Sequence, residues 1–288
     1  MSVRFNLIPH RVVPLVLSCA MGLACADEPK WPFFAMDTAV RDLANLPKAK
    51  ELGYPGVGWR FERAEEMATS VASVSQNGLI LTAVYGGATL TKEGVGFQGD
   101  LEARFAALAG TGTTLWLPVN SSDFAASDPT GDAVAVPEFR RLADQAAKAG
   151  LRVALYPHVG SWVERVQDAV RVAKQVERAN FGVTFNLCHC LRVGDEAKIP
   201  TLLAEAAPYL FLVTINGADR NAGGASWDRL IRPLGEGDYP VSDLLAELET
   251  IGYTGPIGLQ AFGVKLPVAE NLARSMKAWQ EMVSPRLP

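Results

Sequence analysis

Short apolar runs alternate with amphipathic segments along the chain from about residue 30 onward, without a linker or a break in composition. The apolar runs have the length and residue types of buried strands. The predicted strands are residues 32–36, 56–61, 79–85, 113–119, 152–158, 182–187, 211–216 and 257–262. Between them, apolar positions recur at helical spacing. The predicted helices are residues 40–52, 64–77, 101–108, 137–149, 163–176, 198–207, 241–251 and 269–282.

The alternation of strand and helix predicts the fold class. The segment 163–176 is the clearest helix, because Val163, Val166 and Val170 share one face among charged and polar residues. Several predicted helices end at a glycine, such as Gly150, which suits a left-handed C-terminal cap. No Gly-x-Gly-x-x-Gly turn follows the first strand. The sequence therefore predicts a single (β/α)8 TIM barrel rather than a doubly wound open sheet.

The first residues have the layout of a secretory signal peptide. Arg4 and Arg11 precede an apolar run over residues 12–25, and small residues follow at 24–26. The run is shorter than the roughly 20 apolar residues that a membrane-spanning helix needs, and Pro14 interrupts it. We therefore expect cleavage before Asp27.

This interpretation divides the chain into a signal peptide over residues 1–26 and a barrel over residues 27–288. It predicts export to the periplasm or the extracellular space, with no membrane attachment after cleavage. A lipoprotein, lipidated at Cys19 or Cys25, is the alternative.

The charge of the chain indicates which binding partners to expect, and its cysteines indicate whether to expect disulfides. The formal net charge is −4, and no basic tract interrupts the chain, so we expect no nucleic-acid partner. Beyond residue 26 the cysteines are Cys188 and Cys190, which flank His189 too closely to bridge each other easily. We expect two free thiols. If residues 188–190 continue a strand, both thiols point away from His189 into the layer between barrel and helices.

In a barrel of this class the site is built where the strands end, so polar residues at the ends of the apolar runs are the candidates. They include both histidines that lie beyond residue 26, His158 and His189. The strand-end candidates are Asp37, Arg60, Glu62, Tyr85, Asn120, Tyr156, His158, Asn186, His189, Asn216, Asp219, Gln260 and Lys265. Trp162 and Trp227 are candidates to cover a ligand, and the long loop over residues 216–237 is the candidate lid.

Five segments carry a resemblance to a known family. They are ELGYPGVGWR, ALYPHVGSWVERVQDAVRVAKQV, GVTFNLCHCL, VTINGADR and GYTGPIGLQAFG. Together they resemble the xylose-isomerase-like TIM-barrel superfamily, of the sugar phosphate isomerase and epimerase type, from about residue 33 to residue 279. The resemblance implies a divalent metal held by carboxylates and histidines at the ends of the last four strands. It also implies proton transfer at a sugar carbon by two glutamates.

The metal positions of the family are occupied by other residue types in this chain. The strand 5 glutamate falls on or near Tyr156, the strand 6 aspartate on Asn186, the strand 7 histidine on or near Asn216, and the strand 8 glutamate on Gln260. Hard divalent ions depend on oxygen anions, so we expect no metal of the usual kind. If a softer ion binds, the remaining ligands are His158, His189 and Asp219.

A small carbohydrate remains the expected partner, because amides, phenols and indoles suit a sugar. The expected substrate-binding residues are Arg60, Glu62, Tyr85, Trp116, Asn186, Asn216, Gln260 and Lys265. The expected catalytic residues are His158 and His189 for proton transfer, Tyr156 to polarise an oxygen, and Asp219 to orient a histidine.

Proton abstraction next to a carbonyl by these groups predicts an isomerase or epimerase. A lyase or hydratase on an oxidised sugar uses the same enolate. A non-catalytic carbohydrate-binding barrel is the alternative from another class.

Overall fold

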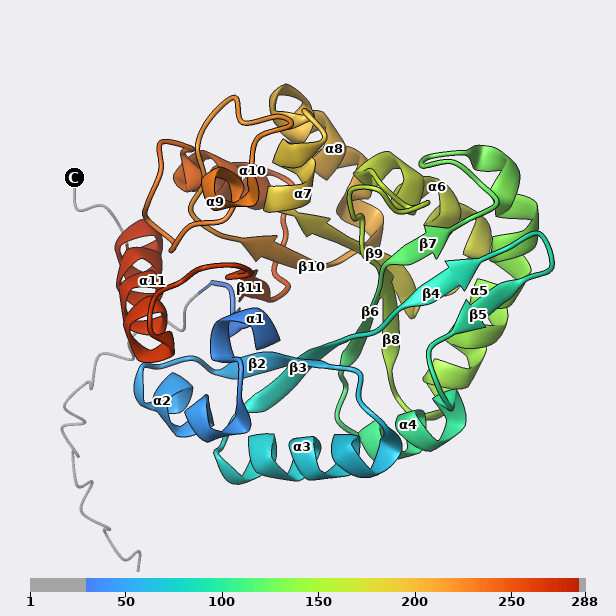
Figure 1. Cartoon of the computed structure of the whole chain (residues 1–288), viewed down its shortest axis with the longest axis horizontal. Helices are drawn as coiled ribbons and strands as arrows, with labels where there is room; N and C mark the ends of the chain where they lie inside the picture. Colours follow the sequence, from blue (N-terminus) through green and yellow to red (C-terminus); the bar gives the residue numbers. More distant parts are fainter. Residues whose placement is uncertain (1–29, 285–288) are drawn as a thin grey trace, which may run out of the picture.

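The structure is a computed structural model, and it describes residues 30–284. Eight parallel strands close into a barrel in the order β1-β11-β10-β9-β8-β6-β3-β2, and helices surround it (Figure 1). The barrel strands are β1 (Phe33–Ala35), β2 (Gly56–Arg60), β3 (Ile80–Tyr85), β6 (Thr114–Leu117), β8 (Arg152–Leu155), β9 (Phe181–Asn186), β10 (Leu210–Ile215) and β11 (Ile257–Leu259). Each lies within a predicted apolar run or shifts from it by one residue, so the predicted (β/α)8 barrel is confirmed. The expected signal peptide lies outside the described residues.

Seven of the eight predicted helices are present, with changes at their ends. The helices are α1 (Asp37–Val40), α2 (Leu46–Glu51), α3 (Ala64–Gln76), α4 (Leu101–Leu108), α5 (Asp132–Lys148), α6 (Val166–Val176), α7 (Leu187–Arg192), α8 (Ile199–Ala206), α9 (Trp227–Leu230), α10 (Val241–Thr250) and α11 (Val268–Val283). The single helix predicted over residues 40–52 is wrong. Arg41 has a positive φ of 63°, which ends α1, and α2 begins anew with a proline in its first turn.

A small second sheet was not predicted from the sequence. It contains β4 (Ala88–Leu90), β5 (Val95–Phe97) and β7 (Val119–Ser121) in the order β5-β4-β7. These strands follow β3 and β6 along the chain and extend beyond the barrel (Figure 1). Three-residue strands are too short to produce a readable hydrophobic period.

The buried side chains form two layers, one outside the barrel wall and one inside it. Alternation along β6 shows the division, because Leu115 and Leu117 join the layer under the helices while Trp116 joins the interior. The interior apolar cluster is Phe34, Met36, Ala83, Trp116, Ala154, Tyr156 and Leu212. Gly258 on β11 leaves room for Phe34, since a Cβ there would lie 2.5 Å from its ring. The barrel interior is therefore filled by packed side chains, and Tyr156 lies at the ends of the strands.

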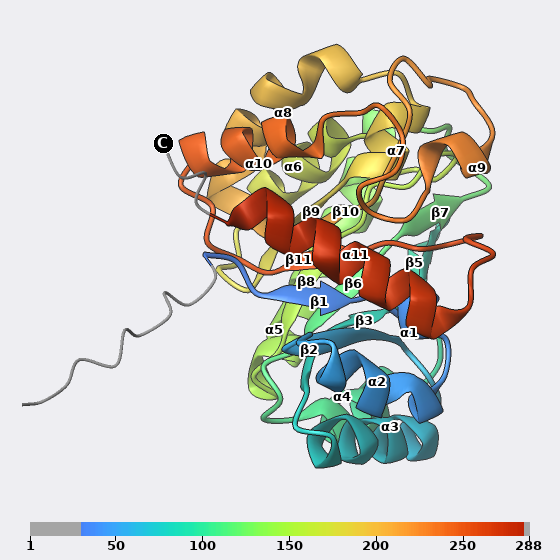
Figure 2. The same ribbon diagram turned by 90° about the vertical axis from the view of Figure 1, so that its left-hand side faces the viewer.

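The two ends of the described chain meet where the barrel closes. Phe33 of β1 pairs with Ile257 of β11, and its ring stacks on Trp279 of α11 at a centroid distance of 4.3 Å. Figure 2 shows α11 lying across the barrel on the side of β1 and α2. Within residues 30–284 no helix has the length and apolarity to cross a membrane.

Candidate active site

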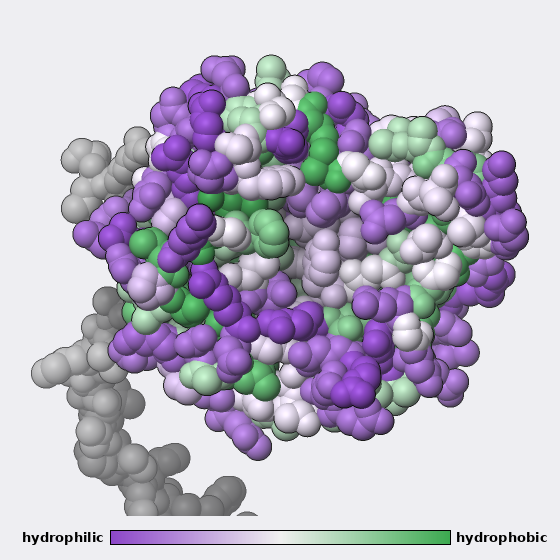
Figure 3. Space-filling model, in the orientation of Figure 1, coloured by the Kyte–Doolittle hydropathy of each residue, from purple (hydrophilic) through white to green (hydrophobic). Residues whose placement is uncertain are grey.

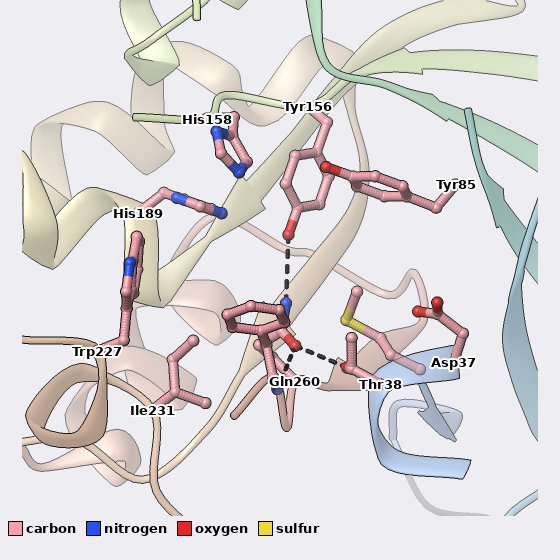
Figure 4. Close-up of a pocket in the computed structure, with 11 residues that line it drawn as sticks. Asp37, Thr38, Tyr85, Tyr156, His158, His189, Trp227, Ile231 and Gln260 are labelled. Carbon is pink, nitrogen blue, oxygen red and sulfur yellow. Dashed lines mark hydrogen bonds between the residues drawn. The ribbon is translucent and has the colours of Figure 1, made fainter. Parts of the chain in front are cut away.

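A cavity of about 330 Å³ opens at the carboxyl ends of the barrel strands. Its lining residues are Met36, Asp37, Thr38, Tyr85, Tyr156, His158, His189, Trp227, Ile231, Gln260 and Phe262 (Figure 4). They come from six strands: Tyr85 ends β3, and the other residues lie in segments that follow β1, β8, β9, β10 and β11. Figure 3 shows a hollow near the centre of the face toward the viewer, bordered largely by pale residues that are neither strongly hydrophilic nor strongly hydrophobic. A cavity built from many strand ends is the usual site position in this architecture.

Two histidines lie against each other on one wall of this cavity. His158 follows β8, His189 lies in α7, and their ring centroids are 4.1 Å apart. Nδ1 of His158 lies 2.9 Å from the carbonyl oxygen of Val159. A carbonyl only accepts, so this nitrogen carries the proton and the second nitrogen of His158 has a free lone pair. Figure 4 shows a ring nitrogen of each histidine directed toward the cavity.

Burial keeps both imidazoles neutral. It lowers the pKa of His158 below its ordinary value. It lowers the pKa of His189 to about 3, with a further lowering from the neighbouring His158. His189 is 6% exposed, and among residues 30–284 its Nδ1 has no hydrogen-bond partner. A buried polar atom without a partner is uncommon, so this nitrogen is available to a ligand or a water molecule.

Two tyrosines form the inner end of the cavity. Tyr156 is fully buried, and its ring meets Tyr85 edge-on at 5.2 Å and His189 edge-on at 5.6 Å. Burial raises the pKa of Tyr156 well above its ordinary value and raises that of Tyr85 to about 12. Both residues are therefore neutral phenols at physiological pH, able to donate a hydrogen bond to a ligand oxygen.

Gln260 follows β11 on the opposite side of the cavity. Its Oε1 accepts hydrogen bonds from the backbone N–H groups of Ala261 and Phe262, each at 2.9 Å, and from the Thr38 hydroxyl at 2.7 Å. Its Nε2 lies 3.5 Å from the Tyr156 hydroxyl oxygen. The side chain is therefore fixed by its oxygen and presents its nitrogen to the site (Figure 4).

Asn186 lies below the cavity and does not line it. It ends β9, is 1% exposed, and accepts a hydrogen bond from Thr214 at 2.9 Å. Its Nδ2 donates to the carbonyl of Pro157 and to Thr184. The predicted substrate-binding role of Asn186 is therefore not supported by its placement, because its amide bonds to neighbouring strands of the barrel.

Asn216 and Trp116 are also buried away from the cavity. Asn216 donates to the carbonyls of Gly217 and Leu230, which ties β10 to the loop that carries α9. Trp116 lies in the barrel interior, with its ring 5.6 Å from that of Tyr156. Both were predicted to bind substrate, and both have positions that support the residues of the lining instead.

Apart from Asp37, the charged residues predicted for the site lie outside the lining. Asp219 forms ion pairs with Arg229 and Arg232, so it does not orient a histidine as predicted. Glu62 accepts a hydrogen bond from Ser70, and Lys265 is exposed.

Arg60 is exposed and lies 4.0 Å from Asp37, which does line the cavity. Burial raises the pKa of Asp37, and Arg60 partly offsets this. Arg60 therefore reaches the site only through Asp37.

Several lining residues were not predicted from the sequence. Thr38 directly follows Asp37 at the end of the first strand, a position that the strand-end rule could have included. Met36, Ile231 and Phe262 are apolar and carry no chemical signal. Trp227, predicted only as a possible cover, lies edge-on to His189 with ring centroids 5.4 Å apart.

The described residues do not fit the divalent metal that the family resemblance implies. Within residues 30–284, no three His, Cys, Asp or Glu side chains are grouped so that they could hold a metal ion. In particular, His158 and His189 are together, but Asp219 is paired elsewhere with arginines.

The two cysteines are buried and free, as expected, but the reason given for their orientation was wrong. The strand ends at Asn186, and residues 187–192 form helix α7. Period-two alternation therefore does not apply to Cys188, His189 and Cys190. Burial raises the pKa of both thiols to about 12, so neither is a nucleophile at neutral pH.

The fold and the cavity define a (β/α)8 barrel protein with a cavity at the strand ends. The sequence matches the xylose isomerase-like TIM barrel family over residues 46–282, and the chain belongs to that family.

A relative, 3-dehydroshikimate dehydratase of Pseudomonas aeruginosa, is 29% identical over 191 residues. That alignment covers 63% of this chain and 28% of the relative, so the chain spans less than a third of that protein's length.

Solved structures share the fold. A xylose isomerase domain protein from Planctomyces limnophilus superposes with a TM-score of 0.64 at 19% identity, covering 88% of this chain and 97% of the other. A D-psicose 3-epimerase, solved in the presence of D-fructose, superposes with a TM-score of 0.67 at 17% identity, covering 88% and 99%. These similarities establish the barrel.

Proposed function

We propose that this protein moves a proton at the carbon next to a carbonyl group in an uncharged carbohydrate, as an isomerase or epimerase does. The observation that carries the proposal is the pair of neutral imidazoles, 4.1 Å apart, on the wall of a cavity that also holds phenol and amide donors. Each imidazole is neutral at physiological pH, so it has a lone pair that can accept a proton from a ligand. The neighbouring phenols stay protonated and can stabilise negative charge on oxygen.

In the proposed mechanism, the free nitrogen of one histidine takes the proton from the carbon next to the carbonyl. The C–H electrons form the enolate double bond, and the negative charge develops on the carbonyl oxygen. Tyr156 donates a hydrogen bond to that oxygen. Return of the proton to the opposite face of the same carbon gives the epimer. Return to the former carbonyl carbon, with transfer of a hydroxyl proton, gives the isomer.

The lining supports an uncharged ligand. All of it lies within residues 30–284, and it includes no lysine or arginine. A phosphate or carboxylate buried there would have no cationic partner, which is costly. Trp227, Tyr85 and Tyr156 supply the aromatic faces and edges that pack against the C–H faces of a sugar.

A dehydratase is the second candidate function, and the sequence relative favours it, since that protein's name states such an activity. The same enolate would then lose a hydroxyl group from the next carbon as water, with a protonated imidazole supplying the proton. A non-catalytic carbohydrate-binding barrel is the alternative without chemistry. Export through residues 1–26 stays part of the proposal and places the substrate outside the cytoplasm.

Proton exchange in D₂O tests the proposal without knowledge of the natural substrate. Purified protein is incubated with D-fructose, D-psicose and D-tagatose, with and without a chelator, and ¹H NMR follows loss of the signals next to the carbonyl. We expect deuterium to enter at such a carbon, and loss of water in the same spectra would identify the dehydratase instead. Binding of a ketose by calorimetry without any exchange would contradict the proposal and support the binding barrel.

A further inference from the structure

The orientation of the Gln260 amide is fixed by groups that can only donate. The backbone N–H groups of Ala261 and Phe262 both point at one atom of the amide, at 2.9 Å. Because an N–H cannot accept from an NH₂ group, this atom must be the oxygen. The Thr38 hydroxyl adds a third hydrogen bond to it at 2.7 Å. The amide nitrogen therefore has to face the other way.

The amide nitrogen faces the Tyr156 hydroxyl. The two atoms are 3.5 Å apart, which is a long hydrogen bond of the kind that shortens when a ligand compresses a site. Among the described residues, Gln260 is the hydrogen-bond partner of the Tyr156 hydroxyl group. The phenol oxygen accepts from Gln260, so its own hydrogen is left to point into the cavity.

We propose that Gln260 is a positioning residue. Its amide nitrogen donates to the Tyr156 oxygen, so the Tyr156 hydroxyl hydrogen is directed to the ligand's carbonyl oxygen. This rests on the function proposed above. A glutamate at the same position would keep an oxygen for Ala261, Phe262 and Thr38. Its second oxygen would then accept from Tyr156 and draw the phenol hydrogen away from the ligand. The amide of Gln260 therefore has a chemical role that an ionised glutamate of the same shape would not fill.

The Gln260→Glu variant tests this inference through its pH dependence. At pH 8 we expect the exchange rate to fall about 100- to 1,000-fold, the range associated with loss of one donor to a developing oxyanion. As the pH falls and the new carboxyl group becomes protonated, it can donate to Tyr156 as the amide does. The ratio of variant to wild-type rates should therefore rise toward one on acidification. A ratio that is constant with pH would overturn the inference.

A second measurement does not depend on turnover. Protein labelled with ¹³Cζ-tyrosine gives one NMR signal for each tyrosine, and Tyr156→Phe identifies the signal of Tyr156. We expect this signal to shift in Gln260→Glu and to titrate with the new carboxyl group, while it stays constant in the wild type over the same pH range. An unshifted signal would overturn the role of Gln260. Absence of exchange in the wild type, with the signal shifted as expected, would overturn the proposed function alone.

Discussion

Two polar clusters near the carboxyl ends of the strands have opposite hydrogen-bonding states. The inner cluster, Thr184, Asn186 and Thr214, is fully buried, and each member bonds to another member or to a strand carbonyl. The outer cluster is the histidine pair, His158 and His189. There, one ring nitrogen is buried without a partner among the described residues, and the rings face the cavity. Polar groups whose bonds are complete hold strands in register, and those whose bonds are incomplete are available to a ligand.

The difference also explains why Asn186 has a structural position. Asn186 connects β9 to β10 through Thr214. A neutral amide can be buried there with modest cost because its bonds are satisfied. The groups that remain available for proton transfer lie one layer further out, on α7 and after β8.

Acidification should distinguish the two clusters most strongly, because the histidines of the outer cluster titrate and the residues of the inner cluster do not. The pKa of His189 is about 3 in the folded protein and about 6.5 when unfolded. Below pH 6.5 the unfolded chain binds more protons at His189, so stability falls as the pH decreases from 6.5 toward 3. The cost is on the order of 1.4 kcal/mol for each pH unit.

Urea unfolding of wild type and His189→Gln at several pH values measures this effect. We expect the two proteins to diverge below pH 6.5, with the wild type losing more stability. Parallel curves would show that His189 is not buried in its neutral form.

Asn186→Asp should lower the free energy of unfolding by about 2–4 kcal/mol, since it replaces a buried donor by an acceptor opposite the Pro157 carbonyl. Thr214→Val removes one donor to Asn186 and should cost about 1 kcal/mol. Both values come from urea unfolding at pH 7. A stable Asn186→Asp that gains ion-dependent exchange would contradict the structural role of this cluster.

Trp227→Ala should affect ligand affinity more than folding. The indole is partly exposed, lies edge-on to His189, and has the Arg192 guanidinium over its ring at 5.4 Å. Loss of an aromatic contact of this kind costs about 1 kcal/mol, which corresponds to roughly 5- to 10-fold weaker binding. Calorimetry with the ketose that shows exchange measures it, and Trp227→Phe should retain most of the affinity. Equal affinity in all three proteins would remove Trp227 from the site.

Lys265→Ala should have the smallest effect. The side chain is exposed and outside the cavity lining, although the strand-end rule placed it in the site. We expect exchange rate and affinity to stay within about 2-fold of wild type, as for most surface substitutions. A larger loss would mean that Lys265 reaches the ligand and that the pocket accepts an anionic group.

The sequence predicted the barrel because each strand is a separate apolar run between amphipathic segments. It also predicted six residues of the lining correctly by position: Asp37, Tyr85, Tyr156, His158, His189 and Gln260. The same rule failed for Asn186 and Asn216, because a place near a strand end does not determine whether a side chain bonds to other parts of the protein or to a ligand. That choice depends on partners distant in sequence, such as Thr214 for Asn186.

Local conformation was the second source of error. Residues 188–190 read as a continued strand, yet α7 begins at Leu187 and turns His189 toward His158. A six-residue helix is too short for its period to be recognised. Asp219 was chosen for its carboxylate, and its arginine partners at positions 229 and 232 became neighbours only through the folding of the long loop.

The most direct test of the histidine pair compares turnover with affinity in His189→Gln, using the ketose that exchanges fastest with the wild type. Glutamine preserves hydrogen bonding and approximate size but cannot take a proton. We predict an exchange rate at least about 100-fold lower, as for loss of a general base, with the dissociation constant changed less than about 3-fold. An unchanged exchange rate in this variant would contradict the account and remove His189 from the mechanism.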